Sequence, residues 1–239
     1  MKKILIATTN QGKFNEISKE FSDLPFKLVN LKQAGLQNEN FDEIHNTTRE
    51  NAISKAEYYG KKSGLLTLAD DTGFFVDYLD GQPGVRAKQF AKTGVARCEK
   101  VIKMMQGVPG KKRGAYYETN ICLFNPQDND FHVFGGKVNG LISNSIVGII
   151  SKYLDYDAIF YFPKFRKNFS QIGTTQKNSV SQRGQAAIQT KLFLMKQYSF
   201  RQLVAAMAVI VKDKKMLMTK RRDHRPEFDN KWEFPGGGV

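Results

Sequence analysis

Two adjacent carboxylates, Asp70 and Asp71, follow a short apolar segment at residues 65–69 that favours a strand. Adjacent acids repel one another, so the pair favours either a bound cation or a solvent-facing loop. Carboxylate oxygens suit Mg²⁺, which proteins usually share with substrate phosphates. Two exposed acids in a turn are the alternative, and the pair alone does not exclude it. Asp42 and Glu43 precede the capped helix described below and are candidates for another oxygen ligand, with Glu39 as the alternative.

The loop after the first predicted strand can hold an anion. A β-prone segment at 3–9 precedes a segment at 13–22 whose apolar residues have helical spacing. Backbone N–H groups at a helix N-terminus bind anions, and a lysine adds positive charge. The Gly-Lys-Ser/Thr pattern of a P-loop is absent, and an N-capped helix with a solvent-exposed lysine is the alternative. The candidate residues of this loop are Thr8, Thr9, Asn10 and Lys13.

A third polar cluster, Lys177, Ser181, Gln182 and Arg183, lies at the start of the last predicted helix. Basic side chains at a helix N-terminus oppose the helix dipole unless an anion is bound there. The cluster therefore indicates a second anion-binding element, with ordinary surface charge as the alternative.

The elements that must position these groups alternate between strand and helix. A capping box from Thr47 to Glu50 begins a helix expected to end near residue 62. This alternation indicates an α/β domain that ends near residue 196. The other expected elements are a strand at 26–31, an extended segment at 74–79, a helix at 95–106, strands at 114–124 and 130–138, an extended segment at 154–162, and a closing helix at 179–196 with Gly184 as its weak point.

The composition is that of a globular protein with an excess of basic residues. The 239 residues are 41% apolar and 25% charged, and the formal net charge is +14. This charge favours polyanionic partners such as nucleotide phosphates, nucleic acid or anionic lipid, although a solvated basic surface explains it equally well. Cys98 and Cys122 form no redox or metal motif, and no apolar run reaches the length of a membrane span. We therefore expect a cytoplasmic protein.

Six ordered motifs resemble the inosine triphosphate pyrophosphatase family over residues 1–193. They are ATTNQGK at 7–13, ENAISKA at 50–56, ADDTGF at 69–74, LDGQPGVRA at 79–87, YDAIF at 156–160 and KNSVSQRGQA at 177–186. The resemblance implies a two-lobed mixed sheet with flanking helices and a central cleft, and a homodimer. It also implies Mg²⁺-dependent cleavage of the α–β phosphate bond of non-standard purine nucleoside triphosphates.

The same resemblance implies roles for individual residues. Asp71 is the expected catalytic carboxylate, with Lys13 beside the phosphates. Glu43, with Asp42 as the alternative, joins Asp71 and Asp70 around the metal. The expected substrate contacts are Thr8, Thr9, Asn10 and Thr72 at the phosphate end, Tyr156 and Asp157 at the base pocket, and Lys177, Gln182 and Arg183 closing over the nucleotide.

The chain departs from the family pattern at the base-recognition end. Leu154 and Asp155 stand where the family usually has Phe-Gly, so the aromatic residue that stacks on the base is missing. Gln182 stands where the family has histidine. A site that loses polar partners for a base can lose much of its discrimination. We therefore expect hydrolysis with a relaxed base preference.

The C-terminal segment differs in character. After a linker at 197–202, residues 203–239 resemble the opening of a Nudix hydrolase domain, with strands at 203–211 and 216–220 before KWEFPGGGV at 231–239. The helix that carries the metal-binding glutamates of Nudix enzymes is not present. We expect an incomplete, β-rich fragment without Nudix activity; a native tail that happens to end in this way is the alternative.

Two other functions compete with the leading one. A basic nucleotide- or nucleic-acid-binding module would bind RNA or DNA in a salt-dependent way without releasing pyrophosphate. A pyrophosphatase acting on another triphosphate, such as a pyrimidine or modified deoxynucleotide, is the second. Aromatic residues do not alternate with the basic ones, so we expect no specific nucleic-acid partner. Because no apolar run is long enough for a membrane span, we also expect no membrane partner.

Overall fold

The computed structural model describes residues 2–150 and 155–198, together with five short segments in the C-terminal region: 205–207, 211–213, 215–220, 232–233 and 236–238. The chain divides into two compact units, Met1–Leu194 and Met195–Val239. Most of the predicted linker at 197–202 lies outside the described residues.

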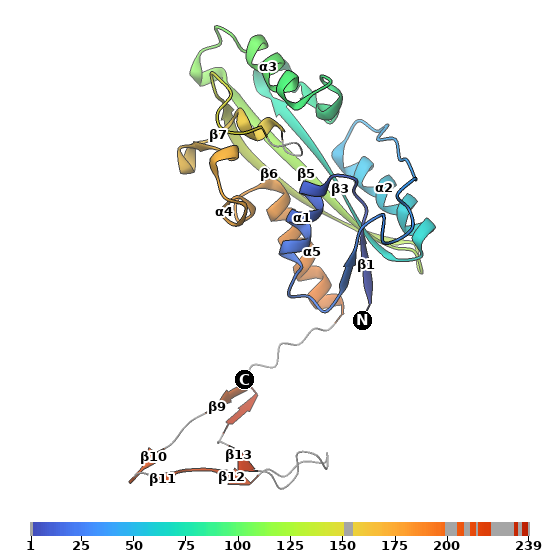
Figure 1. Ribbon diagram of the computed structural model, residues 1–239, viewed down its shortest axis with the longest axis vertical. Helices are drawn as coiled ribbons and strands as arrows, with labels where there is room; N and C mark the ends of the chain where they lie inside the picture. Colours follow the sequence, from blue (N-terminus) through green and yellow to red (C-terminus); the bar gives the residue numbers. More distant parts are fainter. Residues whose placement is uncertain are drawn as a thin grey trace. The chain divides into compact units, whose positions relative to one another are not determined.

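The first unit is built on an eight-stranded mixed sheet (Figure 1). Strand β1 is parallel to its two neighbours, β2 and β3, whereas all the other pairs are antiparallel. The order is β2-β1-β3-β5-β6-β7-β8, and β4 pairs with β3. The strands are β1 Lys3–Ile6, β2 Lys27–Val29, β3 Leu66–Val76, β4 Pro83–Gly84, β5 Gly114–Asn125, β6 Asp130–Ile142, β7 Phe160–Phe162 and β8 Lys167–Asn168.

Strand β3 corrects the prediction that a strand ends just before the two acids. It runs without a break from Leu66 to Val76, because β5 pairs with every residue from Thr67 onward. The other neighbour, β1, pairs only with Leu66–Leu68. Asp70 and Asp71 therefore lie in mid-strand, just past the point where β1 ends and the edge of β3 becomes free to line a site.

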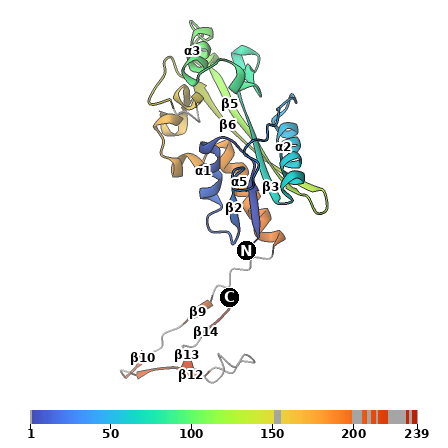
Figure 2. The ribbon, with the colours of Figure 1, turned by 45° about the vertical axis from the view of Figure 1, so that its right-hand side comes forward.

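The helices lie on both faces of this sheet (Figures 1 and 2). Helices α1 and α5 lie side by side on one face, and α2 packs on the other against β3 and β5. The predicted cap at Thr47 is confirmed, because its side chain accepts from the Glu50 N–H. The Asn10 side chain caps α1 by accepting from the Lys13 N–H. The helices are α1 Gln11–Glu20, α2 Thr48–Ser63, α3 Gly94–Met104, α4 Thr174–Asn178 and α5 Gln182–Gln197.

Three expected segments take a different form. The predicted extended segment at 74–79 ends with β3 at Val76, and Asp77–Leu79 form a 3₁₀ turn. The predicted extended segment at 154–162 includes a single 3₁₀ turn, Asp155–Ala158, before β7. The closing helix begins at Gln182 rather than 179, after the short helix α4. Gly184 allows this arrangement, because a Cβ at that position would lie 1.7 Å from the carbonyl oxygen of Asn178. Gly184 is thus required for close packing, and α5 continues through it.

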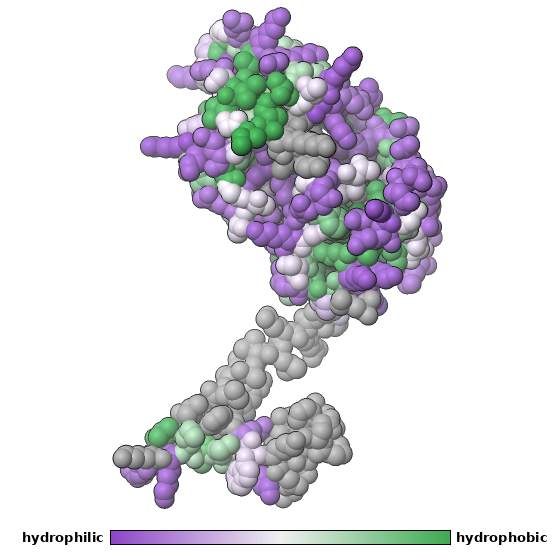
Figure 3. Space-filling view, in the orientation of Figure 1, coloured by the Kyte–Doolittle hydropathy of each residue, from purple (hydrophilic) through white to green (hydrophobic). Residues whose placement is uncertain are grey.

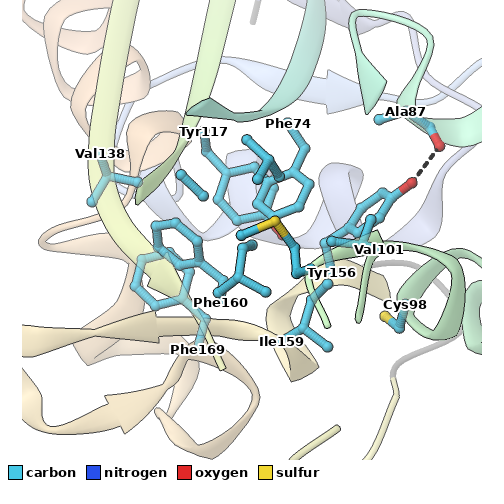
Figure 4. Close-up of a cluster of buried hydrophobic side chains, with 14 of the residues drawn as sticks. Phe74, Ala87, Cys98, Val101, Tyr117, Val138, Tyr156, Ile159, Phe160 and Phe169 are labelled. Carbon is cyan, nitrogen blue, oxygen red and sulfur yellow. Dashed lines mark hydrogen bonds between the residues drawn. The ribbon is translucent and has the colours of Figure 1, made fainter. Parts of the chain in front are cut away.

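Two apolar clusters occupy opposite ends of the long strands. One is rich in aromatic residues, and Figure 4 shows Phe74, Tyr117, Phe160 and Phe169 turned toward one another. The other packs small and aromatic side chains of α2 against β1, β3 and β5. This pair of cores forms the two lobes joined by β3, β5 and β6. Hydrophilic side chains predominate over the first unit on the face shown in Figure 3. Among the described helices, none has the length and apolarity needed to cross a membrane.

The described residues of the second unit form three short antiparallel strand pairs. Several apolar side chains there are exposed, among them Val211, Met216 and Trp232. The predicted strands at 203–211 and 216–220 fall partly on residues outside the description. The pairs are β9 Ala205–Met207 with β14 Gly236–Gly238, β10 Val211–Lys212 with β11 Lys215–Met216, and β12 Thr219–Lys220 with β13 Trp232–Glu233.

Candidate active site

The two acids on β3 serve opposite faces of the sheet. Consecutive side chains of a strand point to opposite sides. Asp70 accordingly contacts Lys13 from α1 and Arg183 from α5, whereas Asp71 contacts Asn51 from α2. The adjacent acids therefore do not form one cluster, and each has its own environment.

Asp70 is a buried counter-ion for two cations. One of its carboxylate oxygens, Oδ2, lies 3.1 Å from Lys13 Nζ and 3.2 Å from Arg183 Nε. Burial raises the pKa of Asp70, but Lys13 and Arg183 outweigh that effect and hold it well below its ordinary value. Asp70 lines neither of the two pockets of the cleft described below, so its metal-binding role stays a prediction. The geometry favours a different role, in which Asp70 holds Lys13 in place.

Asp71 presents a buried carboxylate to the cleft. Its Oδ2 accepts a hydrogen bond from Asn51 Nδ2 at 3.1 Å, and its Oδ1 accepts from the Thr72 N–H at 2.8 Å. Burial raises the pKa of Asp71, and the nearby Glu43 carboxylate adds to this shift. Lys55 and Lys13 oppose it. A carboxylate with a raised pKa beside cations is suited to accept a proton or to ligate a cation.

Glu43 and Lys55 form an ion pair on the α2 side of the cleft. The Lys55 ammonium lies 2.5 Å from Glu43 Oε1. Burial lowers the pKa of Lys55, but Glu43, Asp71 and Asp70 together raise it above its ordinary value. The prediction from sequence missed Lys55. A lysine in the apolar repeat of a capped helix is the signal that would have drawn attention to it.

Two adjoining pockets make up the cleft, and they share Asn10, Lys13, Glu43 and Lys88. The first pocket also contains Asp71, Thr72, Tyr156, Asp157, Lys177, Gln182 and Arg183. The second also contains Thr8, Thr9 and Lys55. The sheet thus brings residues of the three polar clusters of the sequence into one place, whereas Asp70 and Ser181 line neither pocket. Asp42 is exposed and also lines neither.

Buried ion pairs connect several of the charged residues that line the first pocket. Lys177 Nζ lies 2.5 Å from Asp157 Oδ2 and 3.3 Å from Glu16 Oε1. Glu16 also pairs with Arg183, whose Nη2 donates to Thr72 Oγ1 at 3.1 Å. Burial lowers the pKa of Lys177, but Asp157 and Glu16 raise it above its ordinary value, so it is a cation. Glu16 is a residue that the prediction from sequence missed.

The first pocket has an aromatic wall. Tyr156 stacks on Phe74 with ring centroids 4.6 Å apart, and its hydroxyl donates to the Ala87 carbonyl oxygen at 2.8 Å, as Figure 4 shows. The Tyr117 hydroxyl donates to Asp157 Oδ1 at 3.2 Å. Gln182 is buried, and its Oε1 has no hydrogen-bond partner among the described residues. Leu154 and the side chain of Asp155, where the chain departs from the family pattern, lie outside the described structure.

The donor set of the cleft fits Mg²⁺ shared with a substrate. In the described part of the chain, no three His, Cys, Asp or Glu side chains form a group that could hold a metal alone. The Glu43 carboxylate disfavours the charge on Asp71, a repulsion that a divalent cation would relieve. Mg²⁺ is commonly held by one or two carboxylates together with substrate phosphates and water.

Comparison with known proteins gives a consistent result. The sequence profile of the Ham1 family matches residues 4–193. The dITP/XTP pyrophosphatase of Thermoanaerobacter pseudethanolicus is 33% identical over 197 residues, covering 81% of this chain and 97% of that protein. That of Yersinia pseudotuberculosis is 34% identical over 190 residues, covering 78% and 94%. The solved structure of a HAM1 protein from Coxiella burnetii superposes with a TM-score of 0.73 at 30% identity, covering 82% of this chain and all of that one. The Staphylococcus aureus Ham1 protein gives 0.72 at 31% identity, with the same coverage.

Proposed function

The chain belongs to the Ham1 family, and from that premise we propose that it hydrolyses non-standard purine nucleoside triphosphates to nucleoside monophosphate and pyrophosphate. The observation that carries this proposal is the single cleft in which Lys13, Asp71 and Lys177 meet. The lysine side chains of the second pocket suit a polyphosphate. The first pocket, which has polar groups and an aromatic wall, suits a base. Removal of such triphosphates from the nucleotide pool is the corresponding role.

The phosphate end has the charge that the reaction needs. Lys13, Lys55 and Lys88 line the second pocket together with Thr8, Thr9 and Asn10 at the start of α1. When water attacks the α-phosphorus, the bond to the bridging oxygen breaks and pyrophosphate leaves with added negative charge. Fixed ammonium groups and the N-terminal N–H groups of a helix stabilise that charge as it develops.

Asp71 is the group in this cleft that can orient the attacking water and take its proton. Its two oxygens each accept one hydrogen bond from the protein, which leaves lone pairs for water or a cation. Glu43 and Asp71 would hold Mg²⁺, which would neutralise phosphate charge when bound. Asp70 would serve to fix Lys13 and Arg183 rather than to contact the ion.

The base end supports a relaxed preference. Lys177, Arg183 and Asp157 supply donors and acceptors, and Gln182 replaces the usual histidine beside them. An amide can present either an N–H₂ donor or a carbonyl acceptor, so Gln182 can meet a 6-oxo or a 6-amino group. We therefore expect ATP to be rejected less strongly here than by relatives that carry histidine at this position.

A panel of nucleoside triphosphates tests both points. Pyrophosphate release from ITP, XTP, dITP, ATP, GTP and CTP is measured with and without Mg²⁺. We expect Mg²⁺-dependent release, with a kcat/KM ratio of ITP over ATP about tenfold or more below that of the Yersinia relative measured alongside. An equal or higher ratio contradicts the relaxed preference. CTP as the best substrate favours the alternative of a different base, and salt-dependent RNA binding without release favours a binding module.

We propose that the second unit is dispensable for this activity. All of the cleft residues belong to Met1–Leu194, and the family profile ends at residue 193. A chain ending at residue 198 is expected to release pyrophosphate at the full-length rate and to be more soluble, because exposed apolar side chains such as Trp232 are removed. Loss of activity on truncation contradicts this boundary. The Nudix resemblance of residues 203–239 stays a proposal. A homodimer is also a proposal, and sedimentation of the full-length chain and of the chain ending at residue 198 would test it.

A further inference from the structure

We propose that Asn51 is a positioning residue that holds Asp71 and Glu43 at the spacing a divalent cation needs. The inference rests on the metal role proposed above for these two acids. It concerns a residue that lines neither pocket of the cleft and has no exposed surface.

The Asn51 amide joins two separate parts of the chain. Its Nδ2 donates to Asp71 Oδ2 at 3.1 Å and to the His45 carbonyl oxygen at 3.3 Å. Its Oδ1 accepts from the His45 N–H at 3.0 Å. Both donor hydrogens and one acceptor lone pair are thus in use. The amide links β3, which carries Asp71, to the loop that carries Glu43 two residues before His45.

Helix α2 holds that loop at two further points. Ser54 Oγ lies 2.8 Å from His45 Nε2, and Lys55 Nζ lies 2.5 Å from Glu43 Oε1. Residues 40–44 have no helix or strand of their own. Their position therefore depends on side-chain contacts, and the face of α2 that bears Asn51, Ser54 and Lys55 supplies them.

Of these three residues of α2, only Asn51 hydrogen-bonds both to Asp71 and to the loop that carries Glu43. Ser54 and Lys55 hydrogen-bond to the loop, whereas Asn51 bonds to the loop and to Asp71. Removing the amide takes these partners from the His45 N–H and carbonyl and leaves Asp71 with only the hydrogen bond from the Thr72 N–H. Loss of such an outer contact typically weakens metal binding by about 10–100-fold.

The test measures metal binding rather than turnover. Mn²⁺ is titrated into the full chain in the presence of inorganic triphosphate, and free Mn²⁺ is followed by electron paramagnetic resonance. Asn51→Leu removes all three hydrogen bonds with little change of volume. Asn168→Leu is the matched control, because Asn168 is also buried and its Nδ2 donates to Ser143 Oγ at 3.0 Å and Ala158 O at 2.9 Å. Ser54→Ala, a milder change, removes one loop contact.

We expect Asn51→Leu to weaken Mn²⁺ binding by about tenfold or more while Asn168→Leu keeps the wild-type affinity. A folded Asn51→Leu chain with wild-type affinity overturns the inference, as does an equal loss in Asn168→Leu. If circular dichroism shows Asn51→Leu to be unfolded, Ser54→Ala decides: a weakening of about twofold or more supports the inference, and unchanged binding overturns it. A wild-type chain that releases pyrophosphate but binds no Mn²⁺ overturns this inference and the metal role, and leaves the proposed hydrolysis standing.

Discussion

Replacing Asp71 with asparagine is expected to lower kcat for pyrophosphate release by about 10³-fold while the protein stays folded. A positioned general base contributes about 10²–10⁴-fold, and an amide can neither accept the proton of the attacking water nor offer a charged ligand to Mg²⁺. The fold should survive, because burial already disfavours the charge on Asp71 and raises its pKa. The measurement is pyrophosphate release from ITP, with circular dichroism to confirm the folded state.

Asp42→Asn provides the matched control for this result. Asp42 belongs to the same loop as Glu43 but is exposed and lines neither pocket. We expect this variant to turn over at the wild-type rate, which would also remove Asp42 from consideration as a metal ligand. Near-wild-type release by Asp71→Asn would exclude the role assigned to that carboxylate.

The acidic pair shows how far sequence reasoning reaches. Ordered motifs predicted that the loop at 8–13, the acids and the segment at 177–183 meet in one place. The structure brings the loop, Asp71 and that segment into one cleft, whereas Asp70 lines neither of its pockets. The strand was predicted to stop before Asp70, because Asp-Asp-Thr-Gly has the composition of a turn. Pairing with β5, some fifty residues further along the chain, extends the strand through it. Non-local pairing of this kind leaves no local signal.

Glu16 and Asn51 escaped prediction for a related reason. Glu16 lies beside Ile17 in α1, and nothing local distinguishes it from Glu20, the other acid of that helix. Its cationic partners, Lys177 and Arg183, are 161 and 167 residues away in the sequence. Asn51 likewise reaches Asp71 twenty residues further on. A buried polar residue becomes recognisable only when the fold supplies its partners, since burial without them would be unfavourable.

Glu16→Gln is expected to destabilise the first unit by about 3 kcal/mol at pH 7. Glu16 is 7% exposed and pairs with both Lys177 and Arg183, whose charges also stand behind the base end of the cleft. Removing one partner from a buried ion pair leaves uncompensated charge, which typically costs about 3–5 kcal/mol. The neutral amide retains one acceptor, so the lower end of that range applies. Urea unfolding followed by circular dichroism measures the change.

The pH dependence of the stability difference between wild type and Glu16→Gln distinguishes this electrostatic cause from a packing defect. Burial raises the pKa of Glu16, but Arg183 and Lys177 outweigh it and hold the pKa below its ordinary value. A carboxyl whose pKa is lower in the folded state stabilises the fold above its unfolded pKa of about 4.3, and that contribution disappears as the pH falls further. The stability gap between wild type and Glu16→Gln should therefore be full above about pH 5 and should narrow in acid. Glu20→Gln, one turn along α1 and only partly buried, should show little change at any pH. A gap that stays constant down to about pH 3 would mean that the two cations do not depend on the charge of Glu16.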